Sequence, residues 1–225
     1  MKLLAIDTTE TACSAALIID GEVTGRLKIA PRQHSDLILP MMDELLIDAG
    51  LAPAQLDALA FARGPGSFTG VRIAAAVIQG VAFASDLPVV PVSSLRALAQ
   101  GAWRCHGAAY VLAAFDARME EVYFGQYRLG SNELMSLHGE EQVLNPADID
   151  QPALYDWYGA GSGWQQYRQQ LLPLGVAEGR VFSDLQVNAI DVAALGVADI
   201  DLAVAAENAL PVYIRNQVAW KKPAH

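Results

Sequence analysis

The feature that most constrains the fold is a short pattern that occurs once in each half of the sequence. Leu3–Asp7 and Leu112–Asp116 are both runs of four apolar residues that end in an aspartate, and a short turn follows each of them. Short apolar runs bounded by turn residues are typical of buried β-strands. A unit of strand, aspartate and turn that is present twice predicts a protein of two related lobes.

The first copy of this unit continues as a three-stranded meander. Lys2–Asp7, Ala12–Ile19 and Glu22–Ile29 have strand composition, and Asp20-Gly21 suits a hairpin turn, because both central positions of a type I′ turn need positive φ. The elements predicted beyond it are a helix over 35–49, a strand over 57–62, a helix over 68–85, a strand over 88–92 and a helix from 93 or 94 to about 104. This order predicts a mixed sheet with helices on its faces.

The second half repeats the start of this order and then weakens. The elements predicted there are strands over 110–115, 121–128, 133–137 and 153–158, a helix after Trp164 and a helix around 188–195. We therefore expect an α/β protein with the outline of the actin-like ATPase (ASKHA) fold, which has two βββαβα-type lobes, here with the second reduced. We place the first lobe at residues 1–105 and the second at 106–225, and the C-terminal tail is a candidate to pack back on the first lobe.

Composition limits the partners and the compartment. The net charge is −10, and such a surface repels nucleic-acid phosphates, so we expect contact with tRNA only through a partner. No run of about 18 uninterrupted apolar residues is present, and the N-terminus lacks the long apolar segment of a signal peptide. Cys13 and Cys105 are far apart and show no metal-ligand spacing. These features predict a cytoplasmic protein that does not bind a membrane.

The turn after the first strand is a candidate nucleotide contact. Asp7 and Thr8 stand where phosphotransferases of this architecture hold phosphate and metal, although a local turn satisfied by its own side chains is the commoner arrangement. The matching turn at Asp116–Glu121 contains no glycine and brings two glutamates near the place of the phosphates. Glycine allows close approach to phosphate, whereas like charges repel it. We therefore do not expect ATP turnover by this chain alone.

A glycine-rich loop lies between a predicted strand and a predicted helix. Gly159, Gly161 and Gly163 resemble the start of a dinucleotide-binding fingerprint, but Trp164 occupies the position of the third glycine, where close helix packing is needed. Two interpretations stay open. Gly159 and Gly161 either approach an adenosine or form a tight connection between strand and helix.

The most specific motif is a predicted strand–turn–helix. Residues 63–72 read Arg-Gly-Pro-Gly-Ser-Phe-Thr-Gly-Val-Arg, and Gly66 and Ser67 stand at the start of the helix, where backbone N–H groups can hold an anion. This stretch resembles the signature of the TsaB/YeaZ family. Further matches to that family occur in order at residues 6–8, 34–35, 39–40, 116–118, 121–123 and 211–215.

The resemblance implies a non-catalytic relative of TsaD, which uses ATP and a metal-binding His-x-x-x-His motif to transfer a threonylcarbamoyl group to tRNA adenosine. The corresponding positions here are Ser94 and Leu98, and neither side chain is a suitable ligand for a transition metal. His34 does not replace the motif, because Ile38 is four residues after it. We therefore predict no catalytic residue and no metal ligand.

The helices over 35–49 and 68–85 have apolar residues around more than one face, and methionine and alanine are frequent in them. The resemblance implies that they pack against their counterparts on TsaD or on a second copy of the chain. The alternative is that both are buried core helices. The predicted partner contacts are Ile38, Met41, Met42, Leu45, Arg72, Ala75, Ala76 and Gln79.

The resemblance further implies a scaffold or activator subunit for threonylcarbamoyladenosine synthesis in tRNA. Such a subunit binds TsaD, supports recruitment of the ATPase TsaE, and is a homodimer when alone. It has no cofactor of its own, and ATP or ADP contacts it only in complex with partners. Two enzyme classes remain as alternatives. A metallopeptidase of the glycoprotease class requires metal ligands, and a small-molecule kinase or ATPase requires a glycine turn in the second lobe.

Overall fold

Strand β1 (Lys2–Asp7) is the centre of the first sheet, in a computed structural model that describes residues 1–214. It pairs antiparallel with β2 (Ala12–Ile19) and parallel with β4 (Ala58–Ala62). The edges are β3 (Glu22–Ile29) and β5 (Val89–Val92), in the order β3-β2-β1-β4-β5. The predicted meander is confirmed, and the hairpin residues Asp20 and Gly21 have φ values of 49° and 94°.

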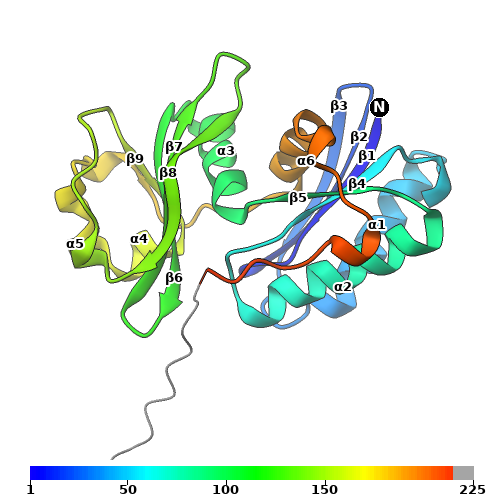
Figure 1. Ribbon diagram of the computed structural model, residues 1–225, viewed down its shortest axis with the longest axis horizontal. Coiled ribbons are helices and arrows are strands. Elements are labelled where there is room, and N and C mark those ends of the chain that lie inside the picture. Colours follow the sequence, from blue (N-terminus) through cyan, green and yellow to red (C-terminus); the bar gives the residue numbers. More distant parts are fainter. Residues whose placement is uncertain (215–225) are drawn as a thin grey trace, which may run out of the picture.

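Alternate residues of β1 face opposite layers of helices, as the pleat of a strand requires. Leu4 and Ile6 pack with α1 (His34–Asp48) and α2 (Phe68–Ser85). Leu3 and Ala5 share a core cluster with α6 (Ala189–Ala198), which covers the other face. Figure 1 shows α1 and α2 together on one side of this sheet and α6 on the opposite side.

The second sheet has the order β10-β9-β6-β7-β8. Its strands are β6 (Tyr110–Arg118), β7 (Glu121–Leu129), β8 (Met135–Leu144), β9 (Tyr158–Ala160) and β10 (Val181–Phe182). The short helices α4 (Ser162–Gln166) and α5 (Arg168–Leu171) cover the outer face, and α3 (Ser94–His106) covers the inner face toward the first lobe (Figure 1). Short 3-10 turns lie at Pro53–Gln55, Pro146–Asp148, Leu172–Leu174, Glu178–Arg180, Ile200–Leu202 and Ala206–Asn208.

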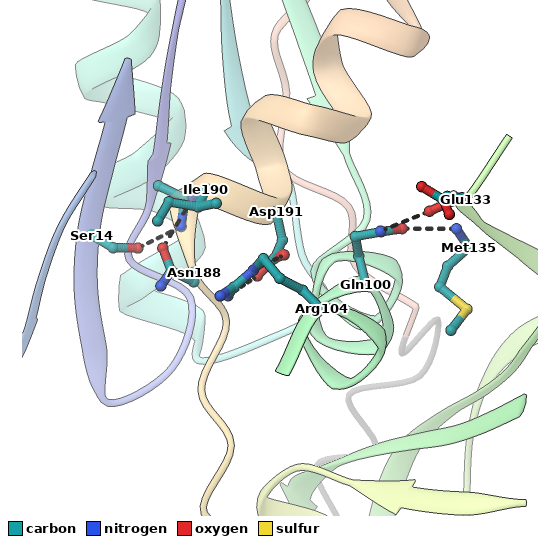
Figure 2. A network of polar contacts seen from close by, with 9 residues as sticks. Ser14, Gln100, Arg104, Glu133, Met135, Asn188, Ile190 and Asp191 are labelled. Carbon is teal, nitrogen blue, oxygen red and sulfur yellow. Dashed lines mark hydrogen bonds and ion pairs between the residues drawn. The ribbon is translucent and has the colours of Figure 1, made fainter. Parts of the chain in front are cut away.

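Polar side chains of α3 connect the two lobes. Arg104 makes a bidentate ion pair with Asp191 of α6, with both N–O distances at 2.8 Å, and Asp191 is only 1% exposed. One turn earlier, Gln100 donates to the carbonyl of Glu133 and accepts from the backbone N–H of Met135 (Figure 2). Helix α3 is therefore fixed to both lobes by side chains from one stripe of its surface.

The structure corrects three expectations drawn from the sequence. Helix α1 follows Gln33 and begins at His34, one residue before the predicted start at 35. The strand expected over 153–158 is replaced by β9, which starts at Tyr158, because Tyr158–Ala160 is the segment that pairs with β6.

The third correction concerns the domain boundary. Helix α6 packs on β1, β2 and β4 of the first sheet, although the predicted second lobe was 106–225 and only its C-terminal tail was a candidate to pack back on the first lobe. The N–H groups of Val204 and Val212 also bond to carbonyls of Val89 and Arg63. The reason is that a two-sided apolar strand needs cover on both faces, and the first half of the chain supplies helices for one face only.

Candidate functional site

A cleft of about 630 Å³ lies between the lobes, and we call it the front cleft. The first lobe contributes the turn after β1 and the start of α2, and the second contributes the β6–β7 turn and the start of α4. Residues that line it include Glu10, Thr11, Gly66, Ser67, Phe68, Arg72, Asp116, Arg118, Tyr123, Ser162 and Tyr213. This is the position between two lobes at which the nucleotide contacts were predicted.

The first turn is closed by its own hydrogen bonds. Asp7 Oδ1 accepts from the N–H of Thr9 at 3.0 Å and from its hydroxyl at 2.6 Å. The hydroxyl of Thr8 donates to the carbonyl of Gly70 at 2.7 Å, and the N–H of Ser67 donates to the carbonyl of Thr9. A Cβ on Gly70 would lie 2.0 Å from the carbonyl oxygen of Thr8, so α2 starts directly against this turn. Asp7, Thr8 and Thr9 are fully buried as a result.

The second turn faces the cleft. The N–H of Arg118 donates to Asp116 Oδ1 at 2.9 Å, and the N–H of Asp116 donates to the Ser162 hydroxyl at 3.1 Å. Arg118, Met119 and Glu120 all have φ near +60°, a conformation in which residues other than glycine are strained. The chain therefore makes the tight β6–β7 connection without the glycine that this geometry favours.

These contacts test whether the front cleft fits a nucleotide triphosphate. Phosphate sites of this kind use free backbone N–H groups. Here the N–H groups of Thr9, Ser67, Gly70, Asp116 and Arg118 all donate to acceptors inside the chain. The cleft is lined by two carboxylates, Glu10 and Asp116, and by two arginines, Arg72 and Arg118, of which Arg118 pairs with Asp116. The five N–H groups named above are therefore not available to a phosphate.

Two carboxyl groups at the cleft floor have perturbed acidities. Burial raises the pKa of Asp7 to about 6, against the hydrogen bonds from Thr9, and its Oδ2 has no hydrogen-bond partner. Burial also raises the pKa of Glu10 to about 7, and the nearby charges of Asp7 and Asp116 act in the same direction. Glu10 accepts a hydrogen bond from Ser162 at 3.1 Å, which joins the two lobes across the cleft.

The structure brings together only part of the predicted nucleotide set. Gly66 and Ser67 line the front cleft, and Ser67 caps α2 by accepting from the N–H of Gly70. Asp7 and Thr8 lie buried beneath its surface and are not accessible to a ligand.

The glycine loop has a packing role. A Cβ on Gly159 would lie 2.5 Å from the indole of Trp164, and a Cβ on Gly161 would lie 2.5 Å from the carbonyl of Ala114. Gly161 also has a φ of 99°. The loop is thus the tight strand-to-helix connection, and only the following residue, Ser162, reaches the front cleft.

Sequence reasoning missed several cleft residues, among them Glu10 and Ser162. Glu10 directly follows the turn Asp7–Thr9, so its position beside the repeated motif was the available signal. Ser162 gave no comparable signal, because its contact with Glu10 joins residues 152 positions apart.

The two residues that occupy the positions of the histidine pair, Ser94 and Leu98, belong to the core of the protein. Ser94 and Leu98 are both fully buried, and the Ser94 hydroxyl accepts from the N–H of Gly64 at 3.1 Å. Leu98 packs beside Gly161. Within residues 1–214, no group of three or more His, Cys, Asp or Glu side chains is placed to hold a metal ion.

The predicted partner contacts on α1 and α2 fall on two different faces. Five of them point into the core of the first lobe, with at most 8% exposure: Ile38, Met41, Met42, Leu45 and Ala75. These five cannot form a surface of the folded chain, which corrects the choice of face. Arg72 and Ala76 are exposed, and Gln79 is half-buried and donates to the carbonyl of Ala209.

Large apolar side chains that sequence reasoning did not select are exposed on the same helices. They are Phe83 at 85%, Ile47 at 75%, Phe68 at 61% and Leu39 at 48% exposure. On α2, Arg72, Ala76, Gly80 and Phe83 follow one another at intervals of three or four residues and therefore share one face. Gly80 has open space where a Cβ would be. We call this face, together with Leu39 and Ile47 of α1, the outer helix face.

Helix α2 is also the one helix of the described chain that is long and apolar enough to cross a membrane. Its residues Ala74, Ile78 and Ala82 pack in the core against the first sheet. Burial in the core therefore explains why the inner side of α2 is apolar.

The fold and the cleft together define the general class of this protein. Two lobes with repeated sheets around a cleft are the actin-like architecture, and in this chain Ser94 and Leu98 occupy the positions of the histidine pair.

Comparison with known proteins then gives the family. Residues 28–222 match the family model described as TsaD: tRNA N6-adenosine threonylcarbamoyltransferase. The chain is 43% identical to the tRNA threonylcarbamoyladenosine biosynthesis protein TsaB of Escherichia coli (strain K12), over 99% of this chain and 98% of that protein. The corresponding protein of Haemophilus influenzae is 41% identical over 99% and 97%. A solved structure of YeaZ from Pseudomonas aeruginosa matches with a TM-score of 0.85 and 45% identity, over 94% of this chain and 99% of that one. The chain belongs to the TsaB/YeaZ family, which is related to TsaD.

Proposed function

We propose that the chain is a non-catalytic scaffold or activator subunit in the synthesis of threonylcarbamoyladenosine in tRNA. In this proposal it binds TsaD, supports recruitment of the ATPase TsaE, and forms a homodimer when alone. It acts in the cytoplasm, contacts tRNA only through its partners, and shares ATP or ADP only within the complex. The names of its close relatives support the pathway.

The observation that carries the proposal is the outer helix face. Three large apolar side chains of this face, Leu39, Ile47 and Phe83, are exposed on two neighbouring helices of the first lobe, although both helices already bury an inner face. Exposed apolar patches on soluble proteins commonly mark contact sites for other proteins. Gly80, Ala76 and the other small residues of α2 allow the backbone of a second helix to approach closely.

The two enzyme alternatives each require a particular set of groups. A metallopeptidase needs several metal ligands within reach of one another, and residues 1–214 contain no such cluster. A kinase or ATPase needs free N–H donors around the phosphates, and five N–H groups in and beneath the front cleft already donate within the chain. Stoichiometric metal in the purified chain, or ATP hydrolysis by the chain alone, would favour these alternatives.

The experiment is a reconstitution of tRNA modification with TsaD, TsaE and this chain, together with a direct affinity measurement for TsaD. The variants are Phe83→Glu and Ile47→Glu on the outer helix face. The matched control is Leu154→Glu, because Leu154 is 95% exposed but lies in the second lobe. We expect the first two variants to lose at least about tenfold in TsaD affinity and to lose modification activity, as hot-spot residues do. The control should behave as the unchanged chain does.

A buried residue of α1, the helix that also carries Ile47, completes the set of variants. Met41→Glu places a carboxylate in the core of the first lobe and should unfold the chain rather than remove a surface contact. Full modification in the absence of the chain would overturn the proposed function. Unchanged TsaD affinity in both folded outer-face variants would show that partner binding uses another surface.

A further inference from the structure

A second cavity lies between the lobes, on the other side of residues 211–214 from the front cleft. Val212 borders both cavities, whereas Tyr213 lines the front cleft and Ile214 lines this one. Its volume is about 710 Å³, within the range of ordinary small-molecule sites. We call it the rear cavity. No residue of the predicted nucleotide or partner set lines it.

Arg63 contributes an unsatisfied donor to the rear cavity. Its Nε is buried and has no hydrogen-bond partner, and none of the ion pairs within residues 1–214 includes it. Its backbone is held on both sides, by the carbonyl of Val92 and the N–H of Val212. Buried donors are nearly always paired, so this Nε–H is placed for an acceptor that residues 1–214 do not provide. A guanidinium group pairs best with a carboxylate or a phosphate.

The lining of the rear cavity also contains two acidic side chains, Glu140 and Glu141. Glu141 accepts hydrogen bonds from the hydroxyl groups of Ser93 and Tyr127, and both end on its Oε1. Acceptor capacity therefore remains on its Oε2. A donor group, and above all a cation, would be favoured beside these two carboxylates.

The remaining charges of the rear cavity are already paired. Arg96 donates to Asp199 and, at 2.7 Å, to the carbonyl of Met135. Among the lining residues this leaves one cation, Arg63, and two carboxylates, Glu140 and Glu141, without an ion pair. A phosphate dianion would be repelled by the two carboxylates, and a simple cation would leave Arg63 unpaired. A small zwitterion carries a partner for each kind of charge.

The rest of the lining is apolar. It consists of Pro91, Val92, Leu137, Leu202 and Val204. We propose that the rear cavity binds a free amino acid with an apolar side chain, with its carboxylate paired to Arg63 and its ammonium group facing Glu141. This binding is independent of the partner assignment above, because it uses none of the residues on the outer helix face.

The test measures binding of L-leucine to the purified full chain by titration calorimetry and ligand-observed NMR. Three probes remove one feature each: L-leucinol lacks the carboxylate, 4-methylpentanoate lacks the ammonium group, and inorganic phosphate carries only negative charge. We expect saturable binding of L-leucine with a Kd of about 1 mM or lower, and each of the other probes at least about tenfold weaker.

Two variants locate the site. Arg63→Gln should weaken L-leucine binding at least about tenfold, whereas Arg128→Gln, a matched change at an exposed residue of β7, should have no effect. Leu137→Trp fills the cavity from a side chain that is 42% exposed, so it keeps the fold and should also remove binding. Absence of saturable binding up to about 20 mM would overturn the proposal. So would phosphate binding as tight as that of L-leucine, or L-leucine binding that survives Leu137→Trp.

Discussion

The two strand-ending turns of this chain begin from the same sequence pattern and end in opposite states. Asp7, Thr8 and Thr9, which begin the turn after β1, are fully buried, with Asp7 held by Thr9 and Thr8 held by Gly70. The turn after β6 lines the front cleft, and Arg118 is 85% exposed there. In the first lobe α2 starts directly against the turn, at Thr8. In the second lobe Gly163 of α4 packs against Ala114, two residues before Asp116.

The difference teaches that the same strand-ending pattern can be restricted in two ways. The first turn is closed by packing, because α2 starts directly against the carbonyl of Thr8. The second turn stays accessible but is acidic, and its backbone N–H groups donate to Asp116 and Ser162. Three predictions test this contrast, and they are ordered by the size of the expected effect.

The largest effect is expected where α2 contacts the first turn. A methyl group on Gly70 would lie 2.0 Å from the carbonyl of Thr8, so Gly70→Ala should destabilise the chain by about 3 kcal/mol. The matched control is Gly80→Ala in the same helix, where the added methyl group meets no atom. Because alanine favours helix more than glycine does, this control should stabilise the chain by about 1 kcal/mol. Urea denaturation measures both changes, and equal effects would mean that the first turn is not closed by packing.

The second prediction uses pH. The pKa of Asp7 is raised from 3.8 to about 6, so the folded chain keeps a proton that the unfolded chain releases. Stability therefore falls as pH rises from about 4 to about 6. Asp7→Asn removes this dependence, and the variant should gain on the order of 3 kcal/mol relative to the unchanged chain over that range.

Glu10→Gln provides the companion measurement for this pH effect. The pKa of Glu10 is raised from 4.5 to about 7, so its contribution to stability should disappear over a higher range, between about 4.5 and 7. Denaturation curves recorded at several pH values separate the two ranges. Parallel pH profiles for Asp7→Asn and the unchanged chain would show that the aspartate is not protonated in the fold.

The smallest effect is expected at the accessible turn. Glu120 has a φ of 63°, and glycine relieves that strain at some cost in chain entropy, so Glu120→Gly should change stability by only about +0.5 kcal/mol. The control is Glu22→Gly at the start of β3, where φ is ordinary and the same change should cost about 1 kcal/mol. A large loss at Glu120 would show that its side chain, rather than its backbone, holds the turn.

Much of the first lobe could be predicted from local sequence. The bounds of β1, β2, β3 and α2 are those read from the sequence, because period, turn residues and caps all act within a few residues. The family could be recognised for a similar reason, since its signature at residues 63–72 is contiguous. Prediction became weaker after residue 130, where short strands such as β9 depend on pairing with distant partners.

Only the tertiary structure decided which surfaces and cavities exist. The apolar residues of α1 and α2 surround both helices, and their periodicity could not tell that Met41 and Leu45 face the sheet whereas Ile47 and Phe83 face solvent. The return of α6 to the first lobe likewise depends on an uncovered sheet face formed by other segments. The sequence by itself determined the repeated lobes, the absence of the histidine pair and the family. The occupied N–H groups of the front cleft and the unpaired Arg63 of the rear cavity were decided by the fold, because each depends on residues far apart in the chain.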